Sequence, residues 1–373
     1  MADGKVLVTG GAGFIGSHVV ELLLAQGYPV RVFDSLVDQV HLGAGPRYVP
    51  RDAEFVRGDV RDRETLSKAL RGVDRIVHLA AEVGVGQSMY EISRYVEANT
   101  AGTGVLLDLI ANERLSIERI VVASSMSIYG EGAYACQAHG AIAPLPRPEA
   151  QLRRGEWATL CTTCGAPLEP VATMEEKPLR PTSVYAISKM DQELLCLAVG
   201  AAYDIGVVAL RYFNAYGPRQ ALSNPYTGVA AIFSSRLLNK KAPIAFEDGQ
   251  QLRDFIHVSD IARATVLALE HAEVKGEAIN VGVGNPLTIS QVAEVLATHL
   301  TIDIAPEISG RFRAGDIRHC WAAPAKAEKL LGFRATVPFE QGVSELVEWV
   351  STQEAEDKLA GAHAELGRRG LAR

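Results

Sequence analysis

The sequence contains little cysteine and few aromatic residues. Only five of the 373 residues are cysteine, and phenylalanine, tryptophan and tyrosine together make up 6%. Five cysteines are too few for a disulfide scaffold in a chain of this length, so we expect its stability to come from a large hydrophobic core. Since 48% of the residues are hydrophobic and 22% are charged, the composition is that of an ordinary globular protein and excludes a disordered or fibrous chain.

Long apolar runs and an excess of positive charge are also missing. No stretch of about 18 uninterrupted apolar residues predicts a membrane span, and no charged segment followed by an apolar stretch and a cleavage site predicts export. We therefore expect a cytoplasmic protein with no membrane partner. The formal net charge of −7 argues against broad nucleic-acid binding, which depends on a positive field.

A glycine-rich turn lies near the start of the chain. The apolar run Val6-Leu7-Val8 is followed by Thr9 to Gly16, TGGAGFIG, which indicates a strand turning sharply into a helix. Gly10 permits backbone angles closed to other residues, Gly13 lets the main chain approach a phosphate, and Gly16 lets the helix pack close to the strand. The N-terminus of that helix presents free N–H groups and a positive dipole. The turn therefore predicts a pyrophosphate site for a dinucleotide.

An acidic residue follows at the expected distance. The next apolar segment, Val30 to Phe33, ends at Asp34, which lies 18 positions beyond Gly16. In folds of this kind such an acid accepts hydrogen bonds from the adenosine ribose and repels a 2′-phosphate, so Asp34 favours NAD over NADP. The alternative is a tight glycine-rich turn followed by an ordinary surface aspartate.

The first part of the chain alternates strand-like and helical patterns, as is typical of βαβ units in a parallel sheet. We predict an α/β fold with a doubly wound parallel sheet of the Rossmann type over residues 1–212, and a smaller C-terminal α/β lobe, mainly 213–350. Residues 351–373 are predicted to be a polar tail, a solvated helix or a frayed end, without an assigned function. The predicted strands are 5–9, 30–34, 54–58, 74–78, 118–124 and 207–212, and the predicted helices lie near 89–113, 184–203, 228–239, 259–271, 288–300 and 339–350.

Tyr185 and Lys189 lie four residues apart at the start of a predicted helix, so both side chains project from one face. A free phenol ionises near about pH 10, but a neighbouring ammonium and a nicotinamide cation each favour the phenolate. The Tyr185 phenol can then remove a hydroxyl proton as a hydride leaves the same carbon. Such pairs also occur by chance on solvated helices. Here the pair is stronger evidence for catalysis because Ser124 and Ser125 place hydroxyl groups at the end of the fifth predicted strand.

Over about residues 4–350 the chain resembles the extended short-chain dehydrogenase/reductases, specifically their nucleotide-sugar epimerase branch. The matching motifs occur in the order of that family. They are the loop of Gly10, Gly13 and Gly16, then Gly58-Asp59-Val60, His78-Leu79-Ala80-Ala81, Asn99, Ser124-Ser125, Tyr129-Gly130, Tyr185 with Lys189, Arg211 to Asn214, Arg253 to Val258 and Arg313 to Asp316.

The resemblance implies a site for NAD and a site for a nucleoside-diphosphate sugar, with the C-terminal lobe binding the sugar nucleotide. It places Asp59 and Val60 at the adenine, and Lys189 also at the nicotinamide ribose. The cofactor side would comprise Gly10, Gly13, Phe14, Ile15, Gly16, Asp34, Asp59, Val60, Leu79, Ala80, Ala81, Asn99, Tyr185, Lys189 and Tyr212.

On the substrate side, the resemblance implies that Asn214, Arg253 and Arg313 hold the diphosphate. A planar guanidinium suits this task because it meets phosphate oxygens in pairs. The alternative for each arginine is an ordinary surface ion pair. Ser127, Asp316 and Val229, the last in a loop over the nucleotide base, complete the predicted substrate residues.

Met126 and Ser127 distinguish the reactions of this branch. At these positions the sugar 4,6-dehydratases carry an acidic pair, the decarboxylases keep a glutamate at the second, and enzymes that invert C3 or C5 keep a cysteine there. This chain has none of these. The resemblance therefore implies inversion at C4 by catalytic Ser125, Tyr185 and Lys189: a hydride leaves C4 to NAD, a 4-keto sugar forms, and the hydride returns to the other face. The expected substrate is a dTDP-linked 6-deoxyhexose such as dTDP-L-rhamnose, or a UDP-hexose.

Two other interpretations remain open at this point. An oxidoreductase of the same fold that makes or consumes a 4-keto sugar would release reduced cofactor. A dinucleotide-sensing regulator without turnover usually loses the pair that Tyr185 and Lys189 form here. By resemblance we also expect a homodimer, in which the helices near 89–113 and 184–203 form a four-helix interface.

Residues 131–176 interrupt the pattern and are interpreted as an inserted module, because they are longer than an ordinary connection. The module carries Cys136-x2-His139 and Cys161-x2-Cys164. Two such arms complete a closed tetrahedral site, so the spacing predicts structural zinc in a zinc-ribbon-like insertion. Chance clustering or a redox pair at Cys161 and Cys164 is the alternative. The module resembles that of bacterial dTDP-L-rhamnose 4-epimerases, which often carry Cys-x2-Cys at the first arm, and we expect it to shape one wall of the sugar pocket.

Overall fold

A parallel sheet forms the centre of the larger part of the molecule. The computed structural model describes residues 4–313, 315–353 and 359–373. The sheet contains β1 (Val6–Thr9), β2 (Val30–Asp34), β3 (Glu54–Arg57), β4 (Arg75–His78), β5 (Arg119–Ser125), β9 (Gly206–Tyr212) and β14 (Glu277–Val281). Within these described residues its order is β14-β9-β5-β4-β1-β2-β3, and every neighbouring pair is parallel. The predicted doubly wound sheet is confirmed, with strand ends that differ from the predicted ones by at most one residue.

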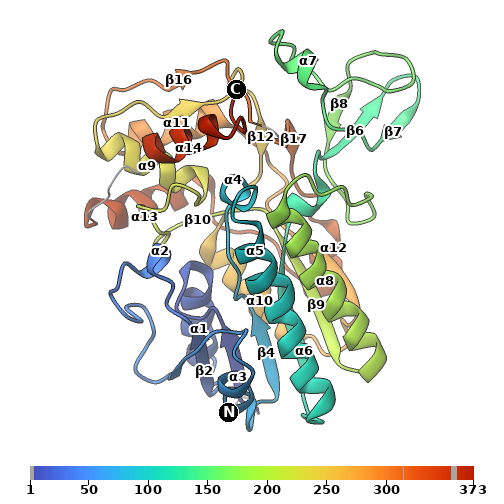
Figure 1. The fold of residues 1–373 in the computed structure, drawn as a ribbon, viewed down its shortest axis with the longest axis vertical. Coiled ribbons are helices and arrows are strands. Elements are labelled where there is room, and N and C mark those ends of the chain that lie inside the picture. The colour runs from blue at the N-terminus through green and yellow to red at the C-terminus, as the bar shows by residue number, and fades with distance from the viewer. Residues whose placement is uncertain (1–3, 314, 354–358) are drawn as a thin grey trace.

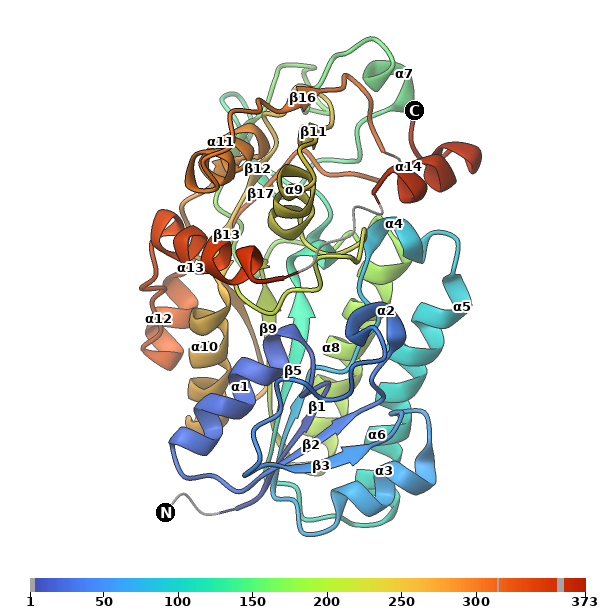
Figure 2. The same ribbon diagram turned by 90° about the vertical axis from the view of Figure 1, so that its left-hand side faces the viewer.

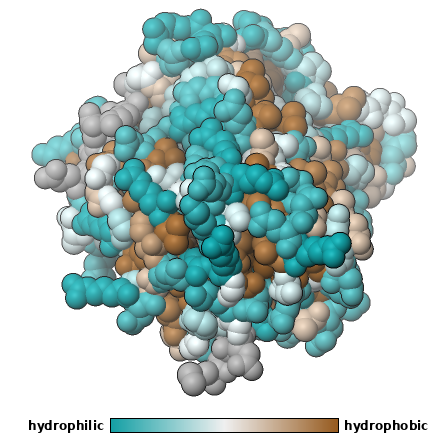
Figure 3. All heavy atoms as spheres, turned by 60° about the horizontal axis from the view of Figure 1, so that its bottom comes forward, coloured by the Kyte–Doolittle hydropathy of each residue, from teal (hydrophilic) through white to brown (hydrophobic). Residues whose placement is uncertain are grey.

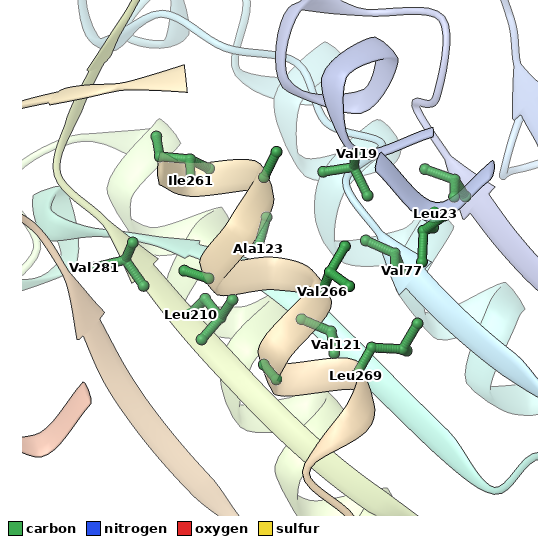
Figure 4. Close-up of a cluster of buried hydrophobic side chains, with 14 of the residues drawn as sticks. Val19, Leu23, Val77, Val121, Ala123, Leu210, Ile261, Val266, Leu269 and Val281 are labelled. Atoms are coloured by element: carbon green, nitrogen blue, oxygen red, sulfur yellow. The ribbon is translucent and has the colours of Figure 1, made fainter. Parts of the chain in front are cut away.

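Helices cover both faces of this sheet (Figure 2). One face carries α1 (Phe14–Ala25), α10 (Val258–Glu270) and α12 (Ala325–Leu331), and the other carries α3 (Arg63–Leu70), α6 (Gly102–Asn112) and α8 (Val184–Tyr203). Figure 4 shows the first layer, in which Val19 and Leu23 of α1 and Val266 of α10 lie over strand residues such as Val121. Because both sheet faces are buried, the central strands are nearly continuous apolar runs rather than alternating ones.

The segment predicted as one helix near 89–113 is divided into several elements. Two short helices, α4 (Val85–Ser88) and α5 (Ile92–Tyr95), precede a π-helical turn, η1 (Val96–Ala101), which continues into α6. Such a turn re-aims the side chains around it and is frequent at functional sites. Here it directs the Asn99 amide to Glu82, in the loop after β4. The apolar periodicity is similar on both sides of the turn, so it could not reveal the break.

The C-terminal lobe consists of short strands and packed helices. Its helices α9 (Val229–Leu238), α11 (Ile289–His299) and α13 (Phe339–Ser351) share one hydrophobic cluster and lie near their predicted positions. Its strands form three small sheets: β10 (Asn214–Tyr216) with β13 (Phe255–His257), β11 (Ile244–Ala245) with β16 (Glu307–Ile308), and β12 (Leu252–Arg253) between β15 (Leu287–Thr288) and β17 (His319–Cys320).

Part of the chain beyond the predicted division at residue 212 belongs to the large sheet. Residues 258–281, which contain α10 and β14, return to the large sheet, where β14 pairs with β9 and covers its edge. The reason is the apolar run around Ile279, which is buried between the helix layers. The two lobes are therefore interleaved along the chain.

The inserted module projects from the molecule beside the C-terminal lobe (Figure 1). It contains a three-stranded antiparallel sheet of β6 (Ala133–Cys136), β7 (Gly140–Ile142) and β8 (Glu169–Val171), together with α7 (Glu149–Leu152). Thr173 joins the module to the C-terminal lobe through backbone hydrogen bonds with Trp321 and Ala323. The Rossmann domain also contains two further short helices, α2 (Asp38–His41) after β2 and the 3-10 helix η2 (Met126–Tyr129) after β5.

Within the predicted polar tail lies an amphipathic helix, α14 (Leu359–Arg368), as one of the two alternatives predicted, and one face of it is buried rather than solvated. Residues 354–358 of the predicted tail lie outside the described residues. Leu359, Ala362 and Leu366 are buried, while the charged side chains face outward. Spacings of three and four residues place these apolar side chains on one helix face.

None of the helices in the described part of the chain is long and apolar enough to cross a membrane. The end of the molecule that lies at the bottom of Figure 1 has a mostly hydrophilic surface with hydrophobic atoms between the polar side chains (Figure 3).

Candidate active site

The glycine turn between β1 and α1 is packed too closely for side chains. Gly10 has φ +70°, and a Cβ atom there would lie 2.8 Å from the backbone nitrogen of Ala80. A Cβ atom on Gly16 would collide with the Gly10 carbonyl. Helix α1 begins at Phe14, directly after Gly13, so its first N–H groups are at the turn. These features match the steric and electrostatic needs of a bound pyrophosphate.

The turn opens into a cavity of about 410 Å³ at the carboxyl ends of the sheet strands. All but one of the predicted cofactor residues line it: Gly10, Gly13, Phe14, Ile15, Gly16, Asp34, Asp59, Val60, Leu79, Ala80, Ala81, Tyr185, Lys189 and Tyr212. The structure therefore brings together positions that are up to 202 residues apart, from Gly10 to Tyr212, in one pocket.

Asp34 is fixed at the end of β2 by the backbone around it. Its carboxylate accepts hydrogen bonds from the N–H groups of Ala12, at 3.0 Å, and Leu36, at 2.9 Å. The carboxylate therefore has a set position beside the glycine turn. Asp59, on the neighbouring loop, pairs with Arg61 at 2.7 Å, and this hydrogen bond holds the pKa of Asp59 below its usual value.

Asn99 is the exception among the predicted cofactor residues. It is fully buried, and its amide bonds to both backbone groups of Glu82 and to the Ser188 hydroxyl at 2.9 Å. Because these contacts use the polar atoms of the amide, Asn99 supports the loop after β4 from behind rather than lining the cavity. It is a positioning residue in this structure.

Tyr185 and Lys189 are presented by the first turns of α8. The Ser183 hydroxyl caps this helix by accepting from Ala186, and the Tyr185 N–H donates to Ser88 of α4 at 3.0 Å. The Lys189 ammonium donates to Gln192 at 2.6 Å. Capping and these side-chain contacts fix the start of the helix, so the pair projects into the cavity from one face.

Burial controls the ionisation of this pair. Burial lowers the pKa of Lys189 from 10.5 to about 7. It raises the pKa of Tyr185, whereas a hydrogen bond with Ser125 lowers that pKa in part. From the sequence we expected the Lys189 ammonium and a bound nicotinamide to lower the pKa of Tyr185. In the structure the hydrogen bond with Ser125 acts in that direction, and the Lys189 ammonium donates to Gln192.

Ser125 ends β5 and carries a second contact. Its Oγ accepts hydrogen bonds from the Ser127 hydroxyl, at 2.9 Å, and from the Ser127 N–H, at 3.2 Å. Ser127, which the resemblance places where dehydratases carry an acid, is thus a donor to Ser125, the predicted catalytic serine. The sequence predicted Ser127 as a substrate residue and as a position without an acid, but it did not predict this contact with Ser125.

A second cavity, of about 300 Å³, adjoins the first. The predicted substrate residues Ser127, Asn214, Val229, Arg253, Arg313 and Asp316 all line it. Asn214 and Val229 line both cavities, so the two spaces adjoin there. The predicted catalytic residues line the first cavity, and Ser127, two positions after Ser125, lines the second.

Two arginines converge on one carboxylate in the second cavity. Arg313 donates to Asp316 at 2.9 and 3.1 Å, and Arg253 lies 3.7 Å from the other oxygen of Asp316. Burial opposes ionisation of Asp316, but the charges of both arginines lower its pKa below the usual value. Two guanidinium groups against one carboxylate leave an excess of positive charge, which suits a diphosphate.

Several residues of the second cavity were not predicted from the sequence. Phe246 comes from a loop of the C-terminal lobe, and Leu359, His363 and Leu366 come from α14. Loop residues gave no periodic signal. The spacing of apolar residues over 359–366 is helical, and it could have identified the buried face of α14.

The four predicted metal ligands form a cluster in the inserted module. One ligand atom from each of Cys136, His139, Cys161 and Cys164 lies within 4.8 Å of the others. The Cys136 and Cys161 sulfurs are 3.5 and 3.6 Å from Nδ1 of His139, and the Cys136 and Cys164 sulfurs are 3.8 Å apart. Backbone N–H groups of Cys164 and Thr163 lower the pKa of Cys161 to about 6. A compact set of three sulfurs and one imidazole fits tetrahedral zinc.

Together, the parallel sheet, the glycine turn and the paired tyrosine and lysine define a dinucleotide-binding enzyme of the short-chain dehydrogenase/reductase type. The model of the NAD dependent epimerase/dehydratase family matches residues 6–148 and 159–282. The chain belongs to this family, as its motifs predicted. The match is interrupted only within the inserted module.

Similar proteins include nucleotide-sugar 4-epimerases along nearly the whole chain. A dTDP-L-rhamnose 4-epimerase of Burkholderia thailandensis is 37% identical over 358 residues, which are 95% of this chain and 97% of the relative. The solved UDP-N-acetylglucosamine 4-epimerase of Methanobrevibacter ruminantium M1, in complex with UDP-N-acetylmuramic acid, is 30% identical with a TM-score of 0.76, covering 95% of this chain and all of that one. A UDP-glucose 4-epimerase of Thermus thermophilus, solved in complex with NAD, is 31% identical with a TM-score of 0.74, covering 94% of this chain and 100% of that one.

Proposed function

We propose that the protein is an NAD-dependent isomerase that inverts C4 of a nucleotide-linked sugar. The observation that carries this proposal is that the cavity lined by Ser125, Tyr185 and Lys189 shares Asn214 and Val229 with the cavity lined by Ser127, Arg253 and Arg313. A dinucleotide bound in one cavity and a sugar nucleotide bound in the other would share this point of contact. The similar 4-epimerases support the same reaction.

The residues around the first cavity fit NAD. The glycine turn and the start of α1 would hold the pyrophosphate, and the fixed carboxylate of Asp34 would accept from the adenosine ribose. NAD supplies a hydride acceptor that can later return the hydride. Lys189, next to Gln192 at the bottom of the site, would bind the nicotinamide ribose.

The protein side chains supply the proton transfer. Tyr185 would take the proton from the C4 hydroxyl and return it after the sugar has presented its other face. Ser125 hydrogen-bonds to Tyr185 and is itself held by Ser127, so its hydroxyl can orient both the phenol and the sugar oxygen. Met126 and Ser127 provide no acid for dehydration, so the 4-keto sugar would only be reduced again.

The substrate class follows from the second cavity and from the relatives. Arg253 and Arg313 would hold the diphosphate while the sugar ring turns about its phosphate linkage. We propose dTDP-L-rhamnose or a related dTDP-6-deoxyhexose as the first substrate to test, because the relative of that name matches 95% of this chain. A UDP-hexose is the second candidate.

Proton NMR of the products tests the reaction. The purified protein is incubated in parallel with dTDP-L-rhamnose, UDP-glucose and UDP-N-acetylglucosamine, while absorbance at the NADH band is followed. Inversion at C4 without net NADH supports the isomerase. Stoichiometric NADH would identify an oxidoreductase instead, and bound NAD without any turnover would identify a dinucleotide sensor.

Two finer features are also proposed. The compact donor set of Cys136, His139, Cys161 and Cys164 would hold a structural zinc ion, because it leaves no open position for substrate. Zinc would keep the two arms of the inserted module together.

A homodimer would use the outer faces of α5, η1 and α8. The side chains of Ile92, Val96, Ile187 and Leu194 are exposed there, although they are apolar. Light scattering should give twice the monomer mass, and Leu194→Glu should give the monomer. Leu160→Glu, at an exposed leucine of the inserted module, is the matched control that should remain dimeric.

A further inference from the structure

The last fifteen residues of the chain form one wall of the second cavity. We call residues 359–373, which comprise α14 and the segment after it, the C-terminal segment. Its cavity-lining residues are Leu359, Ala362, His363, Leu366 and Leu371. The first four follow a helical spacing and therefore share one face of α14. This face belongs to the same cavity as Arg253 and Arg313.

Backbone pairing attaches the end of the chain to the segment that carries Arg313. Phe312 and Arg373 exchange two backbone hydrogen bonds, each 2.9 Å long, and Arg313 and Ala372 form an antiparallel bridge. The Arg373 side chain also pairs with Glu149 of the inserted module. The end of the chain is therefore joined both to a predicted diphosphate-binding residue and to the module.

Side-chain contacts attach the C-terminal segment to residues of the cavity and its surroundings. The His363 ring meets the Phe246 ring edge to face at 5.3 Å, and the Arg313 guanidinium lies over the same Phe246 ring at 4.6 Å. Arg369 lies over the ring of Tyr90 at 4.5 Å. Leu366 packs against Gly86 of α4, where an added Cβ would be 3.4 Å from the leucine. The helix thus contacts elements on both sides of the cavity.

We propose that the C-terminal segment is part of the nucleotide-sugar binding site. Its apolar face, centred on Leu366, packs against the bound nucleoside diphosphate, and its pairing with Phe312 keeps Arg313 aimed at the phosphates. This inference rests on the proposed function for the identity of the ligand. It adds a binding element that the family model, whose match ends at residue 282, does not include.

Steady-state kinetics with dTDP-L-rhamnose, or with whichever sugar nucleotide is turned over, provide the first test. Leu366→Ala should raise KM roughly tenfold, because an apolar contact with the nucleotide is lost, while kcat and bound NAD stay near those of the wild type. The melting temperature should fall because Leu366 is also buried against Gly86, so both proteins are assayed well below the melting temperature of the variant. Ala364→Ser, at an exposed position of the same helix, is the matched control and should leave KM unchanged. A KM for Leu366→Ala within twofold of the wild type overturns the proposal.

Calorimetric titration with dTDP and UDP separates this inference from the proposed reaction. The better-bound nucleotide should bind roughly tenfold more weakly to Leu366→Ala, and also to a chain ending at Gly370, which lacks the pairing with Phe312. If the wild type epimerises no sugar, but both variants bind the nucleotide about tenfold more weakly than the wild type, the proposed reaction is wrong and the inference stands. Equal affinities in wild type and variants, or a wild type that binds neither nucleotide, contradict the inference whatever the reaction.

Discussion

Arg147 and Glu247 form a buried, two-pronged ion pair between the inserted module and the C-terminal lobe. Two guanidinium nitrogens of Arg147 donate to the two Glu247 oxygens at 2.8 and 2.9 Å, and the side chains are only 2% and 1% exposed. Glu247 also accepts from Arg318 at 3.0 Å. Since Glu247 follows Phe246 of the second cavity, the pair fixes the module next to the substrate side.

We expect Arg147→Met to lower the free energy of unfolding by about 3–5 kcal/mol, because it leaves Glu247 charged and buried without its main partner. Urea unfolding followed by circular dichroism measures this loss. Arg154→Met is the control: Arg154 pairs with Glu156 in the same module, but both side chains are exposed, so a loss below about 1 kcal/mol is expected. Similar losses in the two variants would show that the buried pair contributes no more than a surface one.

Replacing Tyr185 by Phe should lower kcat by about 10²–10⁴ because the proton acceptor is removed. Bound NAD should be retained, since the aromatic ring stays in place. Initial rates and the absorbance of released cofactor measure both quantities. The control is Tyr203→Phe at the exposed end of the same helix, and it should be fully active. A Tyr185→Phe enzyme close to wild-type activity would remove this residue from the mechanism.

Protein purified without chelator should contain stoichiometric zinc by elemental analysis. Cys161→Ser should lose the metal and melt at a lower temperature, because one of four ligands is replaced by a poor one. Cys196→Ala, at a buried cysteine of α8 outside the cluster, should keep the zinc. Wild-type protein essentially free of zinc would refute the metal site while leaving the proposed reaction intact.

His78 should make stability sensitive to acid. It lies buried between the hydroxyls of Thr9, at 2.7 Å, and Thr103, at 2.9 Å, and burial lowers its pKa from 6.5 to about 3. Between these values the unfolded chain binds a proton that the folded chain excludes, so stability falls as the pH falls below 6.5. At pH 5 the expected loss from this residue is about 2 kcal/mol.

The difference between His78→Gln and wild type isolates this effect. The variant lacks the titrating group, so from pH 7 to pH 5 its unfolding free energy should fall by about 2 kcal/mol less than that of the wild type. Urea unfolding at both pH values provides the comparison. Equal losses in the two proteins would show that His78 is protonated in the folded state.

Much of the Rossmann domain could be predicted from the sequence because its signals are local. Buried parallel strands are short apolar runs, and the glycine turn has a fixed spacing to Asp34. The predicted cofactor residues meet in one cavity because they lie at strand ends, which a doubly wound sheet brings to the same edge. The contacts of Asn99 with Glu82 and Ser188 could not be predicted, because no sequence pattern shows which distant atoms its amide meets.

The parts that were missed depend on contacts between distant segments. Strand β14 belongs to the sheet because it pairs with β9, and a single short apolar run cannot show that partner. The C-terminal segment has many alanine and charged residues, and its role depends on Phe312 and Phe246, which lie more than 45 residues before its first residue. The composition of the segment therefore predicted its exposed face but not its buried, cavity-lining face.

The position of β14 also determines when the sheet can be completed during synthesis. Strand β9 ends at Tyr212, but the strand that covers its edge spans Glu277–Val281. While the intervening residues are being made, the edge of β9 lacks its neighbour and can pair with strands of other chains. A chain truncated between these two strands should therefore aggregate, whereas one that extends past Val281 has a covered edge.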